Sequence, residues 1–150
     1  MNTGLGSDSP FKTITNALWR IAQSEGTPYT IHLSEGVYSP ATGESFPIIL
    51  KSYVNISGSG EAVTIIDAEE THRVIEIKDC ENNIISNLTL TGGFADDLTS
   101  GLTGGGIYME GSSSTLAYIS VSDNMAIMSG GGIYMEGSSP ILTNLTISGN

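Results

Sequence analysis

One ten-residue segment occurs twice in the chain, and this repeat constrains the fold more than any other feature. GGGIYMEGSS occupies residues 104–113 and returns at residues 130–139, which is 26 residues later. The flanking segments LAYISVSDN and LTNLTISGN keep the same spacing, with apolar residues falling on apolar residues. A unit that cannot bury its own apolar face must stack on copies of itself. The repeat therefore predicts a solenoid rather than an antiparallel sandwich or barrel.

The remaining patterns indicate one helix and many short strands. Apolar side chains recur at helical spacing in residues 13–23, which predicts an α-helix. Beyond this helix the apolar runs are short, rich in β-branched residues and bounded by Gly, Asn, Ser or Asp, as is typical of strands joined by turns. No second helical pattern separates these runs, so an alternating α/β fold is excluded.

The chain is expected to form a single domain, residues 1–150. Its predicted parts are a capping helix at 13–23, first coils at 29–93, an inserted loop at 94–103 and the 26-residue repeats at 104–150. The sequence stops in mid-repeat, without a helical or polar terminal element. We therefore expect a fragment of a longer solenoid, with an uncapped C-terminal end open to further coils or to self-association.

Equivalent residues of successive repeats are expected to lie directly above one another. Alternation along the strand points Ile107 and Met109 inward, and Tyr108 and Glu110 outward. The expected outward columns are Glu76, Tyr108 and Tyr134 in one, and Lys78, Glu110 and Glu136 in the other. The lysine would partly offset the two glutamates, which makes an ordinary surface column the favoured interpretation of these residues.

Asparagine also recurs at equivalent positions of the repeats. Asn124 and Asn150 share a turn position, where a side-chain amide tolerates left-handed geometry and can hydrogen-bond its neighbour. Asn87 and Asn144 both begin Asn-Leu-Thr and are equivalent too, which favours a structural use over glycosylation. The pattern predicts an asparagine ladder of two rungs at Asn124 and Asn150.

These residues resemble a known class of proteins. GGGIYMEGSSPILTNLTISGN resembles the repeat of right-handed parallel β-helix proteins of the pectate-lyase-like class, including the polymorphic outer-membrane protein type. GSDSPFKTITNAL, with IHLSEGVYSPATGESFPIIL after it, is similar to the amino-terminal coil of bacterial and archaeal surface β-helix proteins of undefined function. The resemblance implies an all-β, right-handed parallel β-helix whose helix at 13–23 caps the first coil. It leaves the chemistry open, since this scaffold carries enzymes and adhesins alike.

Charge and composition exclude several classes of partner. Sixteen acidic residues against five lysines and arginines give a net charge of −11, which argues against a phosphate-binding surface and hence against nucleic acid. No apolar run approaches the roughly 18 residues of a membrane span, and the first ten residues lack the features of a signal peptide. We expect a secreted or cell-surface protein whose export signal, where it has one, lies outside this chain.

Candidate contact residues lie on the outward column and in the inserted loop. Tyr108 and Tyr134 could offer an aromatic surface to a sugar ring, although exposed tyrosines are also ordinary surface residues. Asp96 and Asp97 form the only adjacent aspartate pair, in a loop where function commonly lies, but neighbouring strand residues point to opposite faces. All four are candidates for carbohydrate contact.

The resemblance also frames the chemistry that the residues could perform. Polyuronate lyases of this class use acidic calcium ligands near a base, and galacturonan hydrolases use clustered aspartates. Arg73 and Lys78 have no basic counterpart in later coils, and Glu110 and Glu136 are weak candidates for a cation, so no catalytic residue, metal or cofactor is assigned. We expect a non-catalytic, extracytoplasmic β-helix segment for adhesion or carbohydrate contact, with a polysaccharide or cell-surface component as partner. The alternative is a polysaccharide-active lyase or glycoside hydrolase of the same class, with its catalytic residues on missing coils or in residues 94–103.

Overall fold

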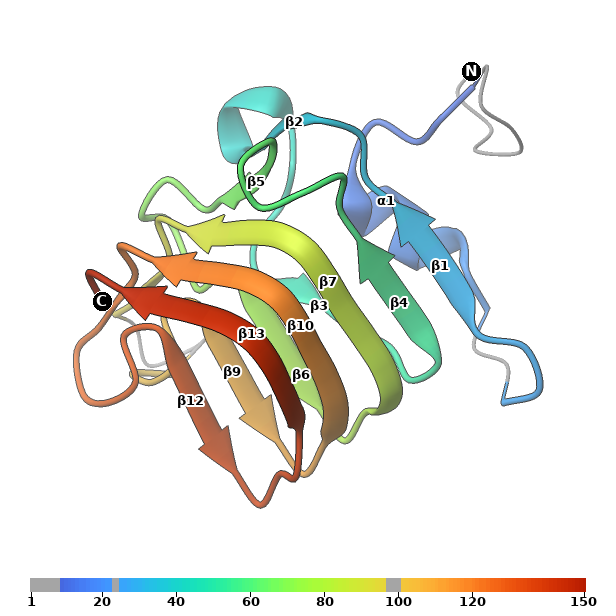
Figure 1. Cartoon of the computed structure of the whole chain (residues 1–150). Helices are drawn as coiled ribbons and strands as arrows, with labels where there is room; N and C mark the ends of the chain where they lie inside the picture. The colour runs from blue at the N-terminus through green and yellow to red at the C-terminus, as the bar shows by residue number, and fades with distance from the viewer. Residues whose placement is uncertain (1–8, 23–24, 97–100) are drawn as a thin grey trace.

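The computed structural model describes residues 9–22, 25–96 and 101–150, and its strands wind into a parallel β-helix (Figure 1). The elements in chain order are α1 (Ile14–Arg20), β1 (Tyr29–His32), β2 (Gly36–Tyr38), a 3₁₀ turn (Pro40–Thr42), β3 (Ile48–Ile49), β4 (Val54–Ser57), β5 (Thr64–Asp67), β6 (Ile75–Lys78), β7 (Glu81–Thr91), β8 (Phe94–Ala95), β9 (Ile107–Glu110), β10 (Ser113–Ser122), β11 (Met125–Ala126), β12 (Ile133–Glu136) and β13 (Ile141–Ser148). The solenoid predicted from the repeat and the all-β parallel β-helix implied by the resemblance are both confirmed.

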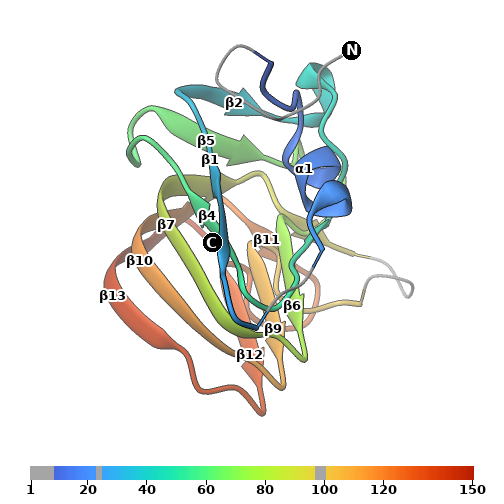
Figure 2. The same ribbon diagram turned by 90° about the vertical axis from the view of Figure 1, so that its right-hand side faces the viewer.

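All strand pairs between successive coils are parallel. The larger sheet has the order β1-β4-β7-β10-β13, with β5 pairing both β2 and β7. A second sheet has the order β3-β6-β9-β12, and β8 pairs β11 in a third. Figure 2 shows β7, β10 and β13 on one side of the solenoid and β6, β9 and β12 on the other. Each coil therefore presents two outer faces that meet at the short turn between these sheets.

The long strands of the larger sheet bend at one residue in each coil. Asn87, Tyr118 and Asn144 occupy this bend, with φ angles of 59°, 56° and 51°. Strand pairing places the three at equivalent positions, because their neighbours on both sides are in register. A left-handed residue turns the strand without breaking the ladder, and asparagine adopts this conformation more readily than most residues. Asn87 and Asn144 thus have the structural use that the sequence predicted.

Stacked aliphatic columns fill the interior of the solenoid. Ile107 pairs with Ile75 on one side and with Ile133 on the other, while Met109 lies between Ile77 and Met135. Ile107 and Met109 are fully buried, whereas Tyr108 and Glu110 face outward. The facing predicted by alternation is therefore confirmed, and the columns bury apolar surface of each coil against the next.

The N-terminal helix is shorter than the predicted span of 13–23. Thr13 is its N-cap, and its side chain accepts a hydrogen bond from the amide of Asn16 at 3.2 Å. The buried Glu44 carboxylate accepts hydrogen bonds from the first amides of the helix, including that of Thr15 at 3.1 Å. At the other end the Lys51 ammonium donates to the Leu18 carbonyl at 2.7 Å and to the Ile21 carbonyl at 3.1 Å. Because Ile21 is already extended, α1 ends at Arg20.

The asparagine ladder forms, but the left-handed residue lies one position earlier than expected. Asn124 donates from its side chain to Asn150 at 3.0 Å and also accepts from the amide of Gly93 at 2.8 Å. The positive φ angles belong to the residues just before these turn positions, namely Gly92, Asp123 and Gly149. The amide thus reaches its neighbours from an ordinary backbone conformation, because the preceding residue makes the turn.

The last coil is more exposed than the coils before it. Leu142 and Ile147, on β13, are 45% and 54% exposed, whereas their pairing partners Leu116 and Val121 are buried. The difference arises because a central coil is covered on both sides and β13 on one. None of the helices in the described residues has the length and apolar character needed to cross a bilayer.

Candidate functional site

A row of tyrosines and glutamates lies on the outer face of the β6-β9-β12 sheet. Register stacks Glu76, Tyr108 and Tyr134 in one column and Lys78, Glu110 and Glu136 in the next, as the sequence predicted. The two tyrosine rings lie 5.6 Å apart with an angle of 14° between their planes. The stack follows from the repeat itself, because identical residues on paired parallel strands face one another. We call Tyr108, Tyr134, Glu110 and Glu136 the tyrosine row.

Arg73 lies at the end of the tyrosine row that is nearer to the earlier coils, over the ring of Tyr108. Its guanidinium is buried, lies 4.5 Å from the centre of the Tyr108 ring and is 3.1 Å from a carboxylate oxygen of Glu76. Its Nη2 also donates to the carbonyl of Gly101 at 3.3 Å. Gly101 has a φ of 89°, and a Cβ there would lie 3.0 Å from the guanidinium, so glycine suits this close approach. Lys78 lies 3.3 Å from Glu76, which leaves Glu110 and Glu136 without that lysine as an ion-pair partner.

The tyrosine hydroxyls engage the neighbouring glutamates. The hydroxyl of Tyr108 donates to Glu110 at 3.0 Å, and that of Tyr134 donates to Glu136 at 3.3 Å. Partial burial, followed by the hydrogen bond and the negative charge of Glu110, raises the pKa of Tyr108 to about 12. The pKa of Tyr134 is raised too, chiefly by the charge of Glu136. Both tyrosines therefore stay protonated donors at neutral pH.

The stack changes what the two rings can offer to a sugar. One face of Tyr108 lies against Tyr134 and the other against Arg73, so a ligand meets only its edge and hydroxyl. In the part of the chain that the structure describes, no side chain stacks on the far face of Tyr134. Ring stacking on a ligand is thus restricted to Tyr134, while the hydroxyl and carboxylate groups form a polar line along the solenoid.

The other predicted site residues are not all brought to this row. Asp96 is exposed and follows β8, which pairs with β11 in the third sheet, whereas Asp97 lies outside the described residues. Glu110 and Glu136 are neighbours across β9 and β12, as a weak cation site would need. Within residues 9–22, 25–96 and 101–150, no group of three or more His, Cys, Asp and Glu side chains lies together as a metal site would require.

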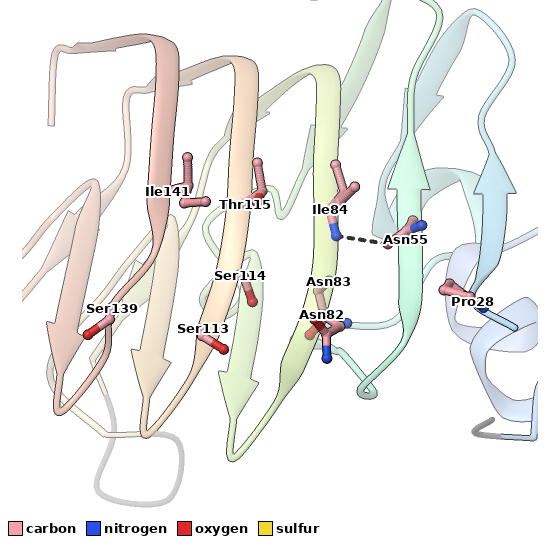
Figure 3. A pocket seen from close by; sticks show the side chains of 10 residues that line it. All are labelled: Pro28, Asn55, Asn82, Asn83, Ile84, Ser113, Ser114, Thr115, Ser139 and Ile141. Carbon is pink, nitrogen blue, oxygen red and sulfur yellow. Dashed lines mark hydrogen bonds between the residues drawn. The ribbon is translucent and has the colours of Figure 1, made fainter. Parts of the chain in front are cut away.

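A groove on the larger sheet was not anticipated from the sequence (Figure 3). Its volume is about 410 Å³, and it is lined by Pro28, Asn55, Asn82, Asn83, Ile84, Ser113, Ser114, Thr115, Ser139 and Ile141. We call this site the polar groove. Figure 3 shows Ile84, Thr115 and Ile141 in line on neighbouring strands, with Asn82, Ser113 and Ser139 nearer the strand starts. A sequence signal for this groove does exist. Pairs of adjacent Asn or Ser residues recur at or just before the starts of β7, β10 and β13.

Two buried polar groups in the lining of the polar groove lack hydrogen bonds. Asn83 donates to the carbonyls of Lys51 and Val54, at 2.5 Å and 2.9 Å, but its Oδ1 has no hydrogen-bond partner among the described residues. The hydroxyl of Ser114, which pairs with Asn83 across β7 and β10, likewise has none. The two residues are 1% and 3% exposed. Buried polar atoms are rarely left unbonded, so these two mark an unusual place in the fold.

Comparison with known proteins supports the fold. A family model described as protein of unknown function (DUF1565) matches residues 1–150. A mutant pectin methylesterase solved in complex with a hexasaccharide is 17% identical, with a TM-score of 0.71 over 98% of this chain and 48% of that one. The pectin methylesterase PemA from Erwinia chrysanthemi is 16% identical, with a TM-score of 0.67 over 97% of this chain and 47% of that one. The chain thus spans about half the length of these structures, and the likeness is one of fold. A search of curated proteins gave no match.

Proposed function

We propose, from the premise that the chain belongs to the family of proteins of unknown function DUF1565, that it is a non-catalytic, extracytoplasmic β-helix segment that contacts carbohydrate. In this proposal the tyrosine row is the contact surface, and its partner is a polysaccharide or another cell-surface component. The observation that carries the proposal is the stack of Tyr108 and Tyr134 with its flanking carboxylates, held on paired strands.

The geometry of the tyrosine row suits sugar hydroxyls. Glu110 and Glu136 accept hydrogen bonds, and the tyrosine hydroxyls can donate and accept, so a line of polar groups runs along the solenoid. The far face of Tyr134 adds an apolar surface for the C–H groups of a sugar ring. The groups stand on rigid strands, so little ordering is needed when a ligand binds.

The structural neighbours add support of a more general kind. Both are pectin methylesterases, and one was solved with a hexasaccharide bound. A parallel β-helix is therefore a scaffold on which carbohydrate can be bound. For the present chain this favours carbohydrate contact and an extracytoplasmic location, which fractionation of the source cells would test.

Binding of soluble polysaccharides to the purified protein would test the tyrosine row. We expect Tyr134→Ser to weaken binding of methyl-esterified pectin by about tenfold, because it removes the free ring face together with the phenol hydroxyl beside Glu136. Tyr118→Asn is the matched control, since it removes an exposed tyrosine from the larger sheet and keeps a residue suited to the left-handed bend. Equal affinities for the wild type and Tyr134→Ser would refute the proposed contact surface.

The likeness to pectin methylesterases also favours a second candidate, a polysaccharide-active enzyme. Its carboxylates would come from Asp96 and Asp97 or from coils outside this chain. Release of methanol or of shorter sugar chains from pectin, lost in Asp96→Asn or Asp97→Asn, would support this candidate over the non-catalytic one. Unchanged pectin after prolonged incubation with the protein would support the non-catalytic proposal.

The proposed contact needs no cofactor. Glu110 and Glu136 could nevertheless hold calcium between coils, since two neighbouring carboxylates are ligands that this ion accepts. Pectin binding measured with calcium and with EDTA would distinguish contact without a metal ion from contact that needs calcium. Calcium-dependent binding that is lost in Glu136→Gln would add the ion to the site.

A further inference from the structure

We infer that Arg73 is the positioning residue of the tyrosine row. Its buried guanidinium supports the ring of Tyr108 and, through the ring stack, sets the orientation of Tyr134, whose far face a ligand can reach. The effect of Arg73 on ligand binding rests on the proposed function, whereas its effect on the ring stack can be measured without any ligand.

Arg73 is a buried cation in a protein that has few cations. The sequence holds five lysines and arginines, and the other arginine, Arg20, is exposed. Arg73 is 1% exposed and is among the largest fully buried side chains. Taking a guanidinium out of water is costly, and a buried ion pair seldom stabilises a fold more than apolar side chains of the same size would. Stability alone therefore does not explain an arginine at this position.

The guanidinium of Arg73 joins three segments of the chain beside the tyrosine row. Nη1 lies 3.1 Å from a carboxylate oxygen of Glu76 on β6, and Nη2 donates to the carbonyl of Gly101 at 3.3 Å. The centre of the Tyr108 ring, on β9, lies 4.5 Å from the guanidinium carbon. A planar guanidinium can donate from its edge while an aromatic ring lies against its face, which a lysine ammonium cannot do. These contacts hold the group in one place against Tyr108.

Lys78 has two of the same partners but is not buried. Its Nζ lies 3.3 Å from the other carboxylate oxygen of Glu76 and 5.1 Å from the centre of the Tyr108 ring. The Lys78 side chain is 46% exposed, and an exposed ion pair constrains its partners little because water and salt screen it. Lys78 thus supplies a positive charge near the ring, whereas Arg73 supplies a charge in a fixed position.

The support given to Tyr108 is passed on to Tyr134 by the ring stack. Tyr108 has Arg73 on one face and Tyr134 on the other, so its ring cannot tilt without losing one of these contacts. The Tyr134 ring lies 5.6 Å from that of Tyr108, which sets the angle of the outer ring. Without Arg73 we expect both rings to tilt more freely. A ligand would then have to order them on binding, which lowers its affinity.

Removing the guanidinium together with its charged partner tests the inference. Arg73→Met combined with Glu76→Gln keeps side chains of similar size and leaves no buried charge unpaired, so the fold should persist. The matched control is Lys78→Met combined with Glu76→Gln, which removes the same charges from beside the same ring. Thermal melts confirm that both double variants are folded.

Two measurements distinguish positioning from folding. Near-ultraviolet circular dichroism reports the packing of the tyrosine rings, and Tyr134→Ser defines the signal that the stack contributes. We expect the Arg73 double variant to lose most of this signal and the Lys78 double variant to keep it. Affinity for methyl-esterified pectin should fall about fivefold in the Arg73 double variant and at most about twofold in the control.

Arg73→Lys provides a second variant that keeps the charge and the partner Glu76. It should lose ring signal and pectin affinity much as the Arg73 double variant does, because an ammonium cannot stack on the ring and donate to its acceptors at once. A wild-type ring signal in Arg73→Lys would show that the planar group is not needed.

Equal losses of ring signal in the two double variants would overturn the inference, since the charge alone would then account for the effect. Loss of ring signal in the Arg73 double variant, with pectin affinity unchanged there but reduced in Tyr134→Ser, would refute its role in ligand binding. A wild type that binds no pectin would refute the proposed contact surface, while the ring signal would still decide whether Arg73 positions the stack.

Discussion

Asn87, Tyr118 and Asn144 share one backbone conformation, although only two of them have a side chain suited to it. A left-handed conformation costs a residue other than glycine about 1–2 kcal/mol. This cost is smaller for asparagine than for most residues, because its short amide can hydrogen-bond locally. Tyr118 is 52% exposed, so packing supplies only part of the compensation. The position is thus governed by the backbone, and the chain carries a less suitable residue in its middle coil.

Replacing Tyr118 tests this interpretation at a single position. Tyr118→Asn should be at least as stable as the wild type, whereas Tyr118→Val should lose about 1–2 kcal/mol, because a β-branched residue is poorly tolerated at positive φ. Urea unfolding of the three proteins measures both effects. A valine variant as stable as the asparagine variant would show that the left-handed conformation does not control this site.

At the scale of elements, side-chain contacts link one coil to the next, in addition to the backbone hydrogen bonds between paired strands. The buried Asn124 receives the amide of Gly93 from one coil and donates to Asn150 in the next, while its amide group also reaches the carbonyl of Leu90 at 3.1 Å. On the outer surface, stacking of the Tyr108 and Tyr134 rings links β9 to β12. A solenoid draws much of its stability from such contacts between nearest neighbours.

Removing the buried amide should therefore be costly. Asn124→Ala leaves the Gly93 amide and the Leu90 carbonyl without this partner and should lower the free energy of unfolding by roughly 2 kcal/mol or more. Asn150→Ala is the matched control, because water can reach the groups that its exposed side chain leaves behind. Chemical denaturation compares the two variants. Equal losses of unfolding free energy in the two variants would mean that burial does not determine how much each asparagine stabilises the fold.

The tyrosine row should make stability depend on alkaline pH. The pKa of Tyr108 is about 12 in the fold against 10.0 for a free tyrosine, so its protonated form is favoured by folding. This contribution is fully present below pH 10 and is lost as the pH rises from about 10 through 12. The stability difference between the wild type and Tyr108→Phe should therefore be constant up to pH 10 and then fall.

Ultraviolet titration of the phenolate supplies the direct measurement. Glu110→Gln should lower the pKa of Tyr108, because it removes the negative charge beside the hydroxyl. Glu35→Gln, a change away from the row, is the control and should leave that titration unchanged. A Tyr108 that ionises near pH 10 in the wild type would contradict its hydrogen bond to Glu110.

At the scale of the whole molecule, burial is deepest in the central coils. The inward residues of β7 and β10 are covered by strands on both sides, whereas β13 is covered on one side and is largely exposed. The helix α1 and the buried Glu44 cover the first coil. A stack of this kind opens where the neighbour contacts are fewest, rather than all at once.

Amide hydrogen exchange should therefore follow the position of a strand in the stack. We expect the slowest exchange in β7 and β10 and the fastest in β13, with β4 protected by its contact with β7. Mass spectrometry of exchanged peptides resolves these segments. Uniform protection along the chain would indicate one cooperative unit, which would contradict unfolding from the less covered coil.

The 26-residue repeat and the alternation of apolar residues were enough to predict a solenoid of stacked strands, the inward facing of Ile107 and the stacking of Tyr108 on Tyr134, whereas the parallel β-helix was implied by the resemblance of the repeat to a known class. Each of these depends on the period and on the chemical type of the residues, and both can be read directly from the sequence. The end of α1 at Arg20 was not predictable in this way, because the Lys51 ammonium that binds its last carbonyls comes from a distant segment.

The tertiary structure alone decided the details of the sites. It placed the left-handed residue at Asp123 rather than at Asn124, buried Arg73 against Tyr108, and assembled the polar groove from four strands. These outcomes depend on which side chains meet across coils of unequal length, and a distance between residues remote in sequence is set only when the whole stack has closed. Repeat and alternation determined that the chain stacks into a solenoid, whereas packing between coils determined which side chains meet on its surface.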